Sequence, residues 1–154
     1  RAPEYVAKVI RCYREAIDSI ENDTYSNAKI NDWMKELESV YNRGFWDGYY
    51  LGQKLGEWSQ GSGSHAKQKK VYIGKGLHYY DKAKIGHFRI ESYDIKVGDH
   101  LLVTGPTTGA KEFDLTELMV GDILQKTATK GEECTIPIDF KVRSSDKLYK
   151  LVEV

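Results

Sequence analysis

The chain has 154 residues, with 40% apolar and 30% charged side chains, and its 23 basic residues balance 23 acidic ones. This length suits one ordinary domain or a small domain with a helical extension, and the composition is that of a globular protein rather than a disordered one. No apolar run approaches the ~20 residues needed to cross a bilayer, and the balanced charge gives no indication of a polyanionic partner for the chain as a whole.

Two amphipathic helices are predicted in the first third of the chain. Pro3 suits the first position of a helix, and the second helix follows a polar turn at residues 22–27, with Asn27 or Asn31 as the expected N-cap and an end near Asn42. In both helices apolar residues recur every three or four positions, which indicates one buried face. The first stripe is Val6, Val9, Ile10, Tyr13, Ile17 and Ile20. The second is Ile30, Trp33, Met34, Leu37, Val40 and Tyr41.

The stripe on the first helix needs a partner. The short loop between the helices predicts an antiparallel pair. Because the chain begins at Arg1 without a methionine, we expect it to be a piece of a longer protein, in which case the native partner of this stripe is missing. An orphaned stripe of this kind could drive homodimerisation.

Residues 43–70 are predicted to connect the helices to a second region, and they combine aromatic with basic side chains. Aromatic faces stack nucleic-acid bases and lysines neutralise phosphates, so this pattern suggests contact with RNA or another macromolecular substrate. The alternative is that the aromatic side chains pack the connector against the adjoining domain. This alternative is favoured, because mixed aromatic and basic stretches are only a weak signal of nucleic-acid binding. The glycine-serine run at 60–64 is expected to be a flexible loop. The candidate contact residues are Arg43, Trp58, Lys67, Lys69 and Lys70.

Residues 71–154 are predicted to form a small antiparallel β-barrel or sandwich. Short β-branched or aromatic runs recur about every ten residues between turn-forming residues. Two copies of Val-Gly-Asp, at 97–99 and 120–122, predict turns that each start a strand, while 105–109 predicts a hairpin connection and 144–147 a turn before the last strand. The predicted strands lie at 71–73, 77–80, 85–90, 100–103 and 148–152.

The titratable residues show no catalytic or metal-binding pattern. The histidines at 65, 78, 87 and 100 lack the spacing of a zinc site, and adjacent Glu132 and Glu133 would point to opposite faces of a strand. Cys12 and Cys134 have no CxxC spacing, which suits free thiols in a reducing compartment and predicts a cytoplasmic protein. We therefore predict no catalytic residue, metal or cofactor in this chain.

Several segments, in order along the chain, resemble peptidase family U32, also called the collagenase-like protease family. The helix Ala2-Pro3-Glu4-Tyr5-Val6-Ala7, with Tyr13-Arg14 after it, is similar to the last helix of the family's catalytic domain. Arg43-Gly44-Phe45 with Gly48-Tyr49-Tyr50 and Gly52 resembles the segment that follows it, although Trp46-Asp47 departs from the commoner residues. Segments that resemble the family's C-terminal domain lie at 69–75, 97–99, 105–107, 142–143 and 146–150.

This resemblance implies an α+β architecture. Residues 1–42 would be a helical segment at the end of a TIM-like catalytic domain, 43–70 a connector, and 71–154 a C-terminal β-barrel domain like the second domain of translation elongation factors. The family's clustered cysteines lie upstream and neither Cys12 nor Cys134 matches them, so the resemblance implies a catalytically inert chain. Family members are peptidases or support hydroxylation of tRNA or ribosomal RNA.

The leading hypothesis is therefore a non-catalytic C-terminal accessory domain that helps an upstream catalytic domain of the same protein to recognise a protein or RNA substrate. One alternative is a purely structural module that packs on the catalytic domain. Another is that the parent protein acts in RNA hydroxylation rather than proteolysis. A reading in which this chain itself hydrolyses peptides is the weakest, because no nucleophile and base are paired. No membrane partner is expected.

Overall fold

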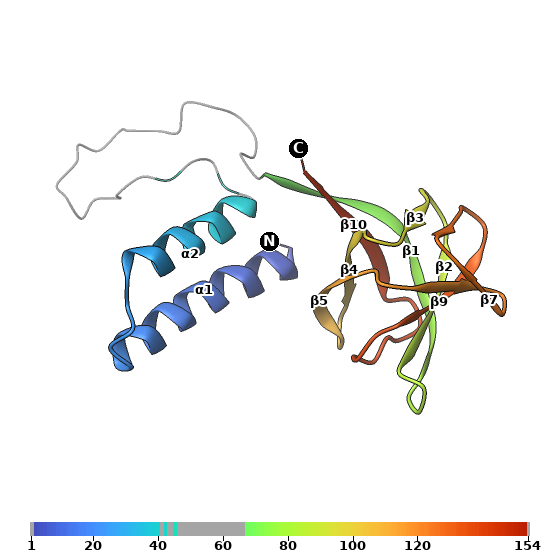
Figure 1. Cartoon of the computed structure of the whole chain (residues 1–154), viewed down its shortest axis with the longest axis horizontal. Helices are drawn as coiled ribbons and strands as arrows, with labels where there is room; N and C mark the ends of the chain where they lie inside the picture. Colours follow the sequence, from blue (N-terminus) through green and yellow to red (C-terminus); the bar gives the residue numbers. More distant parts are fainter. Residues whose placement is uncertain (1, 41, 43–44, 46–66, 154) are drawn as a thin grey trace. The chain divides into compact units, whose positions relative to one another are not determined.

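The computed structural model describes residues 2–40, 42, 45 and 67–153. By their internal contacts these residues form two compact units: residues 1–68 together with 154, and residues 69–153. Each unit is described by itself below, first the helical unit and then the β unit (Figure 1).

The helical unit contains the two predicted helices. Helix α1 spans Pro3–Glu21 and begins with the predicted proline, and helix α2 spans Asn27–Ser39. The N-cap of α2 is Ser26, whose hydroxyl accepts a 3.4 Å hydrogen bond from the Lys29 amide, so the prediction of Asn27 or Asn31 was wrong. Serine satisfies an orphan amide of the first turn as well as asparagine does. Contacts between residues 8 and 39 and between residues 15 and 33 show that the helices run antiparallel, as predicted.

Helix α2 also ends earlier than predicted. Val40 adopts an extended conformation (φ −94°, ψ 170°), so the helix stops at Ser39 rather than near Asn42. The Asn42 side-chain amide donates hydrogen bonds to the carbonyl oxygens of Glu38 and Val40. These bonds satisfy carbonyl groups at the end of the helix.

The β unit is an antiparallel sheet, as predicted. Its eight strands lie in the order β5-β4-β10-β1-β2-β9-β6-β7, and a two-stranded sheet pairs β3 with β8. The predicted strands at 71–73 and 77–80 form one long strand, β1, and the predicted runs at 85–90, 100–103 and 148–152 correspond to β2, β4 and β10. The strand bounds are Gln68–Tyr80 (β1), Ile85–Ile90 (β2), Ile95–Lys96 (β3), His100–Gly105 (β4), Gly109–Asp114 (β5), Leu118–Val120 (β6), Ile123–Gln125 (β7), Thr127–Ala128 (β8), Glu133–Pro137 (β9) and Lys147–Glu153 (β10).

The predicted barrel is not closed. Among the described residues no pairing joins β5 to β7, which are the two ends of the sheet. The physical reason lies in these edge strands: β5 carries the charged residues Lys111, Glu112 and Asp114, and β7 is only three residues long. Charged and short edge strands resist pairing with one another.

The core of the β unit lies on the inner faces of its strands. Phe88 and Ile90 of β2, Leu101 and Val103 of β4, and Leu148 of β10 are fully inaccessible to solvent. Side chains two residues apart share one face of a strand, and this explains the spacing of the buried positions. The inward-facing residues of these strands therefore build one continuous core.

The predicted turns are confirmed. Gly98 (φ +95°) and Gly121 (φ +60°) adopt the positive φ that glycine permits, and each turn leads into a strand. The Asp99 carboxylate accepts a 2.9 Å hydrogen bond from the Lys96 amide, which precedes the turn rather than following it. Gly105 pairs with Gly109 across the predicted hairpin connection, and a turn at Ser144 and Ser145 precedes β10.

In the described parts of the chain, neither helix combines the length and the apolar character that a membrane crossing requires.

Candidate functional site

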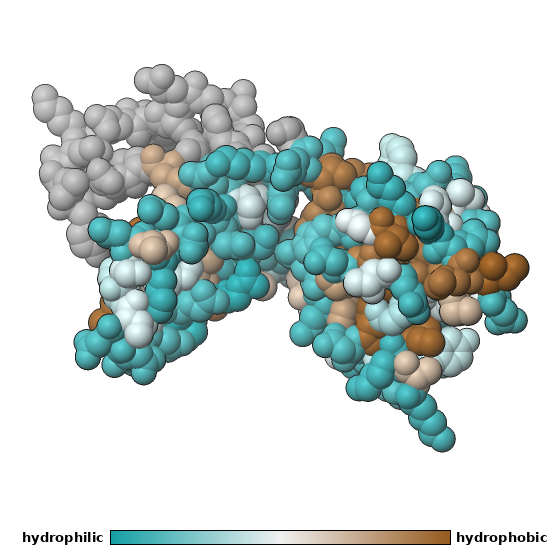
Figure 2. Space-filling model, viewed as in Figure 1, coloured by the Kyte–Doolittle hydropathy of each residue, from teal (hydrophilic) through white to brown (hydrophobic). Residues whose placement is uncertain are grey.

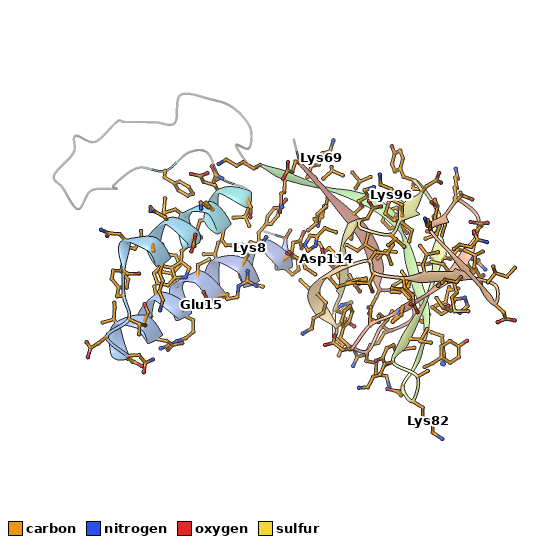
Figure 3. The ribbon with its side chains drawn as sticks, viewed as in Figure 1. Lys8, Glu15, Lys69, Lys82, Lys96 and Asp114 are labelled. Carbon is orange, nitrogen blue, oxygen red and sulfur yellow. The ribbon has the colours of Figure 1, made fainter. Side chains whose placement is uncertain are left out.

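The structure places the predicted contact residues in different surroundings. Arg43 and Trp58 lie outside the described residues. Lys67 belongs to the helical unit, where its side chain pairs with the Glu38 carboxylate and its amide donates to the Glu38 carbonyl oxygen over 3.3 Å. Lys69, near the start of β1 (Figure 3), is exposed, and Lys70 is half-buried.

Lys69 and Lys70 do not share one face of β1. Adjacent residues of a strand point to opposite faces, so Lys69 and Lys70 project from opposite sides of β1. Lys67 is already paired with a carboxylate of the helical unit. The two cations of β1 are therefore divided between the two faces of the strand.

One cluster on the β unit does combine a predicted lysine with aromatic rings. The Lys70 ammonium lies 4.8 Å from the centroid of the Tyr149 ring, and Tyr149 packs edge-on against Tyr72 with centroids 5.7 Å apart. The ammonium group is attracted to the electron-rich face of the aromatic ring, which is a cation–π contact. Sequence reasoning missed Tyr149 because it is far from Lys70 along the chain, and only the neighbouring positions of β1 and β10 bring the two residues together.

Hydrogen bonds hold the cluster in place. The Tyr72 hydroxyl donates a 2.6 Å hydrogen bond to Glu91, and the Lys75 ammonium lies 2.8 Å from the other oxygen of that carboxylate. The hydrogen bond to Glu91, together with burial, raises the pKa of Tyr72 to about 12. The hydrogen bonds from Lys75 and Tyr72 lower the pKa of Glu91. This part of the surface thus presents a neutral Tyr72 phenol and a Glu91 carboxylate that is already paired. These groups suit weak polar contacts rather than acid–base chemistry.

Two of the described histidines are cross-strand neighbours, because His78 of β1 pairs with His87 of β2 in the sheet register, whereas His100 lies on β4. His78 packs edge-on against Tyr80 at 4.7 Å between ring centroids, and His87 lies 3.0 Å from a carboxylate oxygen of Glu133. His100 lies 2.7 Å from Asp114. Within the described ranges, no three His, Cys, Asp or Glu side chains meet in a way that could hold a metal ion. His65 falls outside these ranges.

Both cysteines are buried. Burial raises the pKa of Cys12, with a further contribution from Glu36, and burial raises the pKa of Cys134 to about 12. A thiol must ionise to act as a nucleophile, so these environments suit structural cysteines rather than reactive ones. Cys12 lies between the helices and Cys134 in the core of the β unit.

Helix α1 packs on α2 through its polar face. The Lys8 ammonium donates to the Ser39 hydroxyl over 3.3 Å, and the Trp33 indole donates to Glu15 over 3.0 Å. Figure 3 labels Lys8 and Glu15 on α1. The buried side chains of α1 are Glu4, Cys12 and Ser19, none of which belongs to the predicted apolar stripe. The contact between the two helices is therefore largely polar.

The opposite face of α1 is apolar and exposed. Five residues of the predicted stripe have 43–64% of their surface exposed. We call this surface the α1 apolar face, and it consists of Val6, Ile10, Tyr13, Ile17 and Ile20. The sequence predicted this stripe, but not that α2 would leave it uncovered.

An open groove of about 920 Å³ runs along the polar contact between the helices. Its lining mixes cations such as Arg11, Lys29 and Lys35 with the carboxylates of Glu15 and Asp32. Since both signs of charge are interspersed, the groove shows no preference for an anionic or a cationic ligand.

Two helices followed by an antiparallel sheet define an α+β protein whose described residues present an uncovered helix face and a polar aromatic cluster. Comparison with known proteins adds the family: residues 1–60 match the model of peptidase family U32. The resemblance to this family that was stated from the sequence is therefore confirmed.

The relatives with the same sequence pattern are longer than this chain. Two collagenases of Porphyromonas gingivalis are 47% identical over 150 residues, which is 97% of this chain but only 36% and 42% of the relatives. An uncharacterized protease of Methanocaldococcus jannaschii is 31% identical over 153 residues, and the match covers 97% of this chain and 37% of that protein. The chain thus spans about two fifths or less of the curated relatives it matches.

Two solved structures are similar to part of this chain. The C-terminal domain of a U32 peptidase from Geobacillus thermoleovorans matches 51% of this chain and 90% of its own length, with 14% identity and a TM-score of 0.49. A bacterial selenocysteine-specific elongation factor matches 55% of this chain and 14% of its own length, with 14% identity and a TM-score of 0.37.

Proposed function

We propose that this chain is a non-catalytic accessory part of a longer U32-family protein, at its C-terminal end, and that it helps a preceding catalytic domain to recognise a polypeptide substrate. The observation that carries the proposal is the α1 apolar face. Burying the exposed half of each of its five side chains would contribute roughly 1 kcal/mol apiece. A helix that turns its polar face to its neighbour and its apolar face outward is suited to pack on further protein.

The relatives support both halves of the proposal. The two collagenases are 47% identical to this chain, yet the match leaves more than half of each relative outside it, which is room for a separate domain. Those relatives and the archaeal protein are named as proteases, so a polypeptide is the substrate class we propose. Both cysteines are buried free thiols, which is compatible with an accessory role.

RNA is the second candidate substrate. It rests on Lys70 beside Tyr149 and on exposed Lys69, because aromatic rings next to cations are how single-stranded nucleic acid is held. We favour polypeptide because Lys69 and Lys70 project from opposite faces of β1 and Lys67 is paired with Glu38. If RNA were the substrate, reversing the charges of these lysines would weaken binding and flatten its salt dependence.

The test is removal of the β unit, residues 69–153, from the full-length protein that carries this sequence. Hydrolysis of an unfolded protein and of a short peptide are compared. Substrate recognition by the β unit predicts that the rate on the protein falls at least about tenfold while the rate on the peptide is kept. Equal loss on both substrates would favour the alternative, a purely structural module, and no loss on either would overturn both readings. The isolated chain is expected to hydrolyse neither substrate.

A matched pair of substitutions tests the docking surface. Ile10→Lys places a charge on the α1 apolar face, whereas Lys35→Glu changes the charge of an exposed residue of α2. In the full-length protein the first should destabilise the packing of α1 and the second should not, as measured by protease sensitivity of the helical unit. Equal sensitivity of the two variants would contradict a docking role for this face.

A further inference from the structure

Strand β7 is an edge strand with apolar side chains on both of its faces. Ile123 and Leu124 are 66% and 64% exposed, although neighbouring residues of a strand point to opposite faces. All three residues of β7 are exposed. Figure 2 shows apolar residues protruding from the β unit at the side where Figure 1 labels β7. Large apolar residues exposed on both faces of an edge strand are unusual in a folded protein and point to an interaction.

The register of the β6–β7 hairpin leaves the backbone of Leu124 facing outward. The two-residue turn at Gly121 and Asp122 makes Val120 and Ile123 the hydrogen-bonded pair, so the next pair, Met119 with Leu124, is not hydrogen-bonded. Met119 instead pairs with Thr135 of β9 on its other side. By the same alternation, the N–H and C=O of Leu124 point to the open edge of the sheet.

The other edge of the sheet is protected. Strand β5 carries Lys111, Glu112 and Asp114, and charged residues on an edge strand oppose the addition of another strand. Strand β7 has no charged residue, and charges appear only at its two ends, on Asp122 and Lys126. The sheet therefore offers one edge, and not the other, to an extended chain.

We propose that β7 binds an extended segment of a polypeptide substrate, which adds to the sheet as a further strand beside Leu124. The proposal deepens the polypeptide recognition proposed above and rests on it. The open N–H and C=O groups define the partner's chemistry, because only a peptide backbone supplies matching donors and acceptors at strand spacing. Ile123 and Leu124 favour apolar side chains at alternate positions of the segment.

The small size of this edge argues for a substrate segment rather than a second copy of the chain. Stable dimers bury about 800 Å² on each partner, far more than three exposed residues present. A substrate that is also held at a catalytic domain needs only weak affinity here, because the second contact is then intramolecular. RNA is not favoured, since β7 presents apolar residues and only one flanking cation, Lys126.

The experiment uses the 154-residue chain and a fluorescent peptide of about ten alternating valine and threonine residues. A second peptide of the same sequence carries an N-methyl group on every residue, which removes the N–H donors on both edges of the extended peptide. Fluorescence anisotropy should show binding of the first peptide and at least about tenfold weaker binding of the second. Saturation with the first peptide should slow exchange of the Leu124 amide hydrogen.

The variant Ile123→Thr with Leu124→Thr keeps strand propensity while removing the apolar side chains, and it should bind at least about tenfold more weakly. The control is Tyr93→Thr, because Tyr93 is 68% exposed but lies in the bend after β2. The proposal is overturned if the threonine double variant binds like the parent chain, if the Leu124 amide is unaffected, or if β7 instead mediates dimerisation in sedimentation experiments. In those cases polypeptide recognition at another surface survives, unless removing the β unit also leaves hydrolysis unchanged.

Discussion

The turn before β10 makes a prediction that can be worked out from its hydrogen bonds. Asp146 is 2% exposed, and its Oδ2 atom accepts a 2.9 Å hydrogen bond from the Arg143 amide and a 2.6 Å hydrogen bond from the Thr108 hydroxyl. The first bond closes the turn and the second ties it to the β4–β5 hairpin. The perturbation is Asp146→Ala, which removes both hydrogen bonds at once.

The expected cost follows from these two contacts. A hydrogen bond to a charged group contributes about 1.5–3 kcal/mol when it is buried, and less when water can replace it. Since Thr108 is half-buried, we take the lower end for each bond and expect Asp146→Ala to lower the free energy of unfolding of the β unit by about 3 kcal/mol. Asp146→Asn should cost less, about 1 kcal/mol, because both donors use the same oxygen and an amide can place its oxygen there.

The assay must report on the β unit alone. All three tryptophans, at positions 33, 46 and 58, precede β1, so tryptophan fluorescence is unsuitable, and exchange of the Leu101 and Leu148 amides is the better measurement. A double-mutant cycle with Thr108→Val isolates the hydrogen bond between Thr108 and Asp146. If Thr108→Val costs the same free energy with and without the Asp146 side chain, the proposed tie between turn and hairpin does not exist.

Two further predictions concern titratable groups. Burial lowers the pKa of His100, but hydrogen bonds to Asp114 and Glu112 outweigh it and raise that pKa above its ordinary value of 6.5. The protonated histidine therefore stabilises the fold fully below pH 6.5, and this contribution is lost as the pH rises through the pKa of His100 in the folded chain. The difference in unfolding free energy between the parent chain and His100→Gln, measured by urea titration, should shrink over the same pH range. A His100→Gln difference that is constant with pH would contradict this linkage. Burial likewise raises the pKa of Cys12 and raises that of Cys134 to about 12, so iodoacetamide should leave both thiols unmodified in the folded chain. As urea is added, Cys12 should react first, because few apolar side chains are buried between α1 and α2. The order of modification is measured by mass spectrometry. If Cys134 reacted before Cys12, the helical unit would be the more stable of the two units.

Local sequence patterns predicted the strands whose own residues are mainly apolar or aromatic. Strand β2 has alternating large side chains, with Phe88 and Ile90 in the core, and its limits were predicted correctly. Strand β5 was missed because glycine and charged residues are rare in strands. It forms because the hairpin turn brings Gly109 opposite Gly105 and so sets the register of the whole pair.

Strand β9 was missed for a related reason. It begins at Glu133 and ends at Pro137, which resembles a loop when considered alone. It is nevertheless an inner strand between β2 and β6, and its Cys134 and Ile136 side chains enter the core. The open shape of the sheet was equally beyond local patterns, because closure depends on two edge strands that are distant in sequence.

The candidate contact residues show the same limit. The sequence singled out Lys67, Lys69 and Lys70 as candidate contacts because they follow one another closely, but strand alternation directs Lys69 and Lys70 to opposite faces of β1. Tyr149, which lies under Lys70, is supplied by β10. Composition can indicate that cations and rings are abundant, whereas their grouping depends on strand order.

Helix α1 shows why a correctly predicted stripe does not reveal its partner. Three-and-four spacing shows that one helix face is apolar, and in a free-standing helix pair that face would be expected to meet the other helix. Here α2 meets Lys8, Arg11 and Glu15 instead, through contacts with Ser39, Glu36 and Trp33. A polar contact of this kind contributes little net stability, because partly exposed ion pairs are worth about 1 kcal/mol or less. If the α1 apolar face docks on further protein as proposed, that contact would supply the apolar burial that α2 does not. Docking of this face and the stability of the helical unit would then depend on the same contacts.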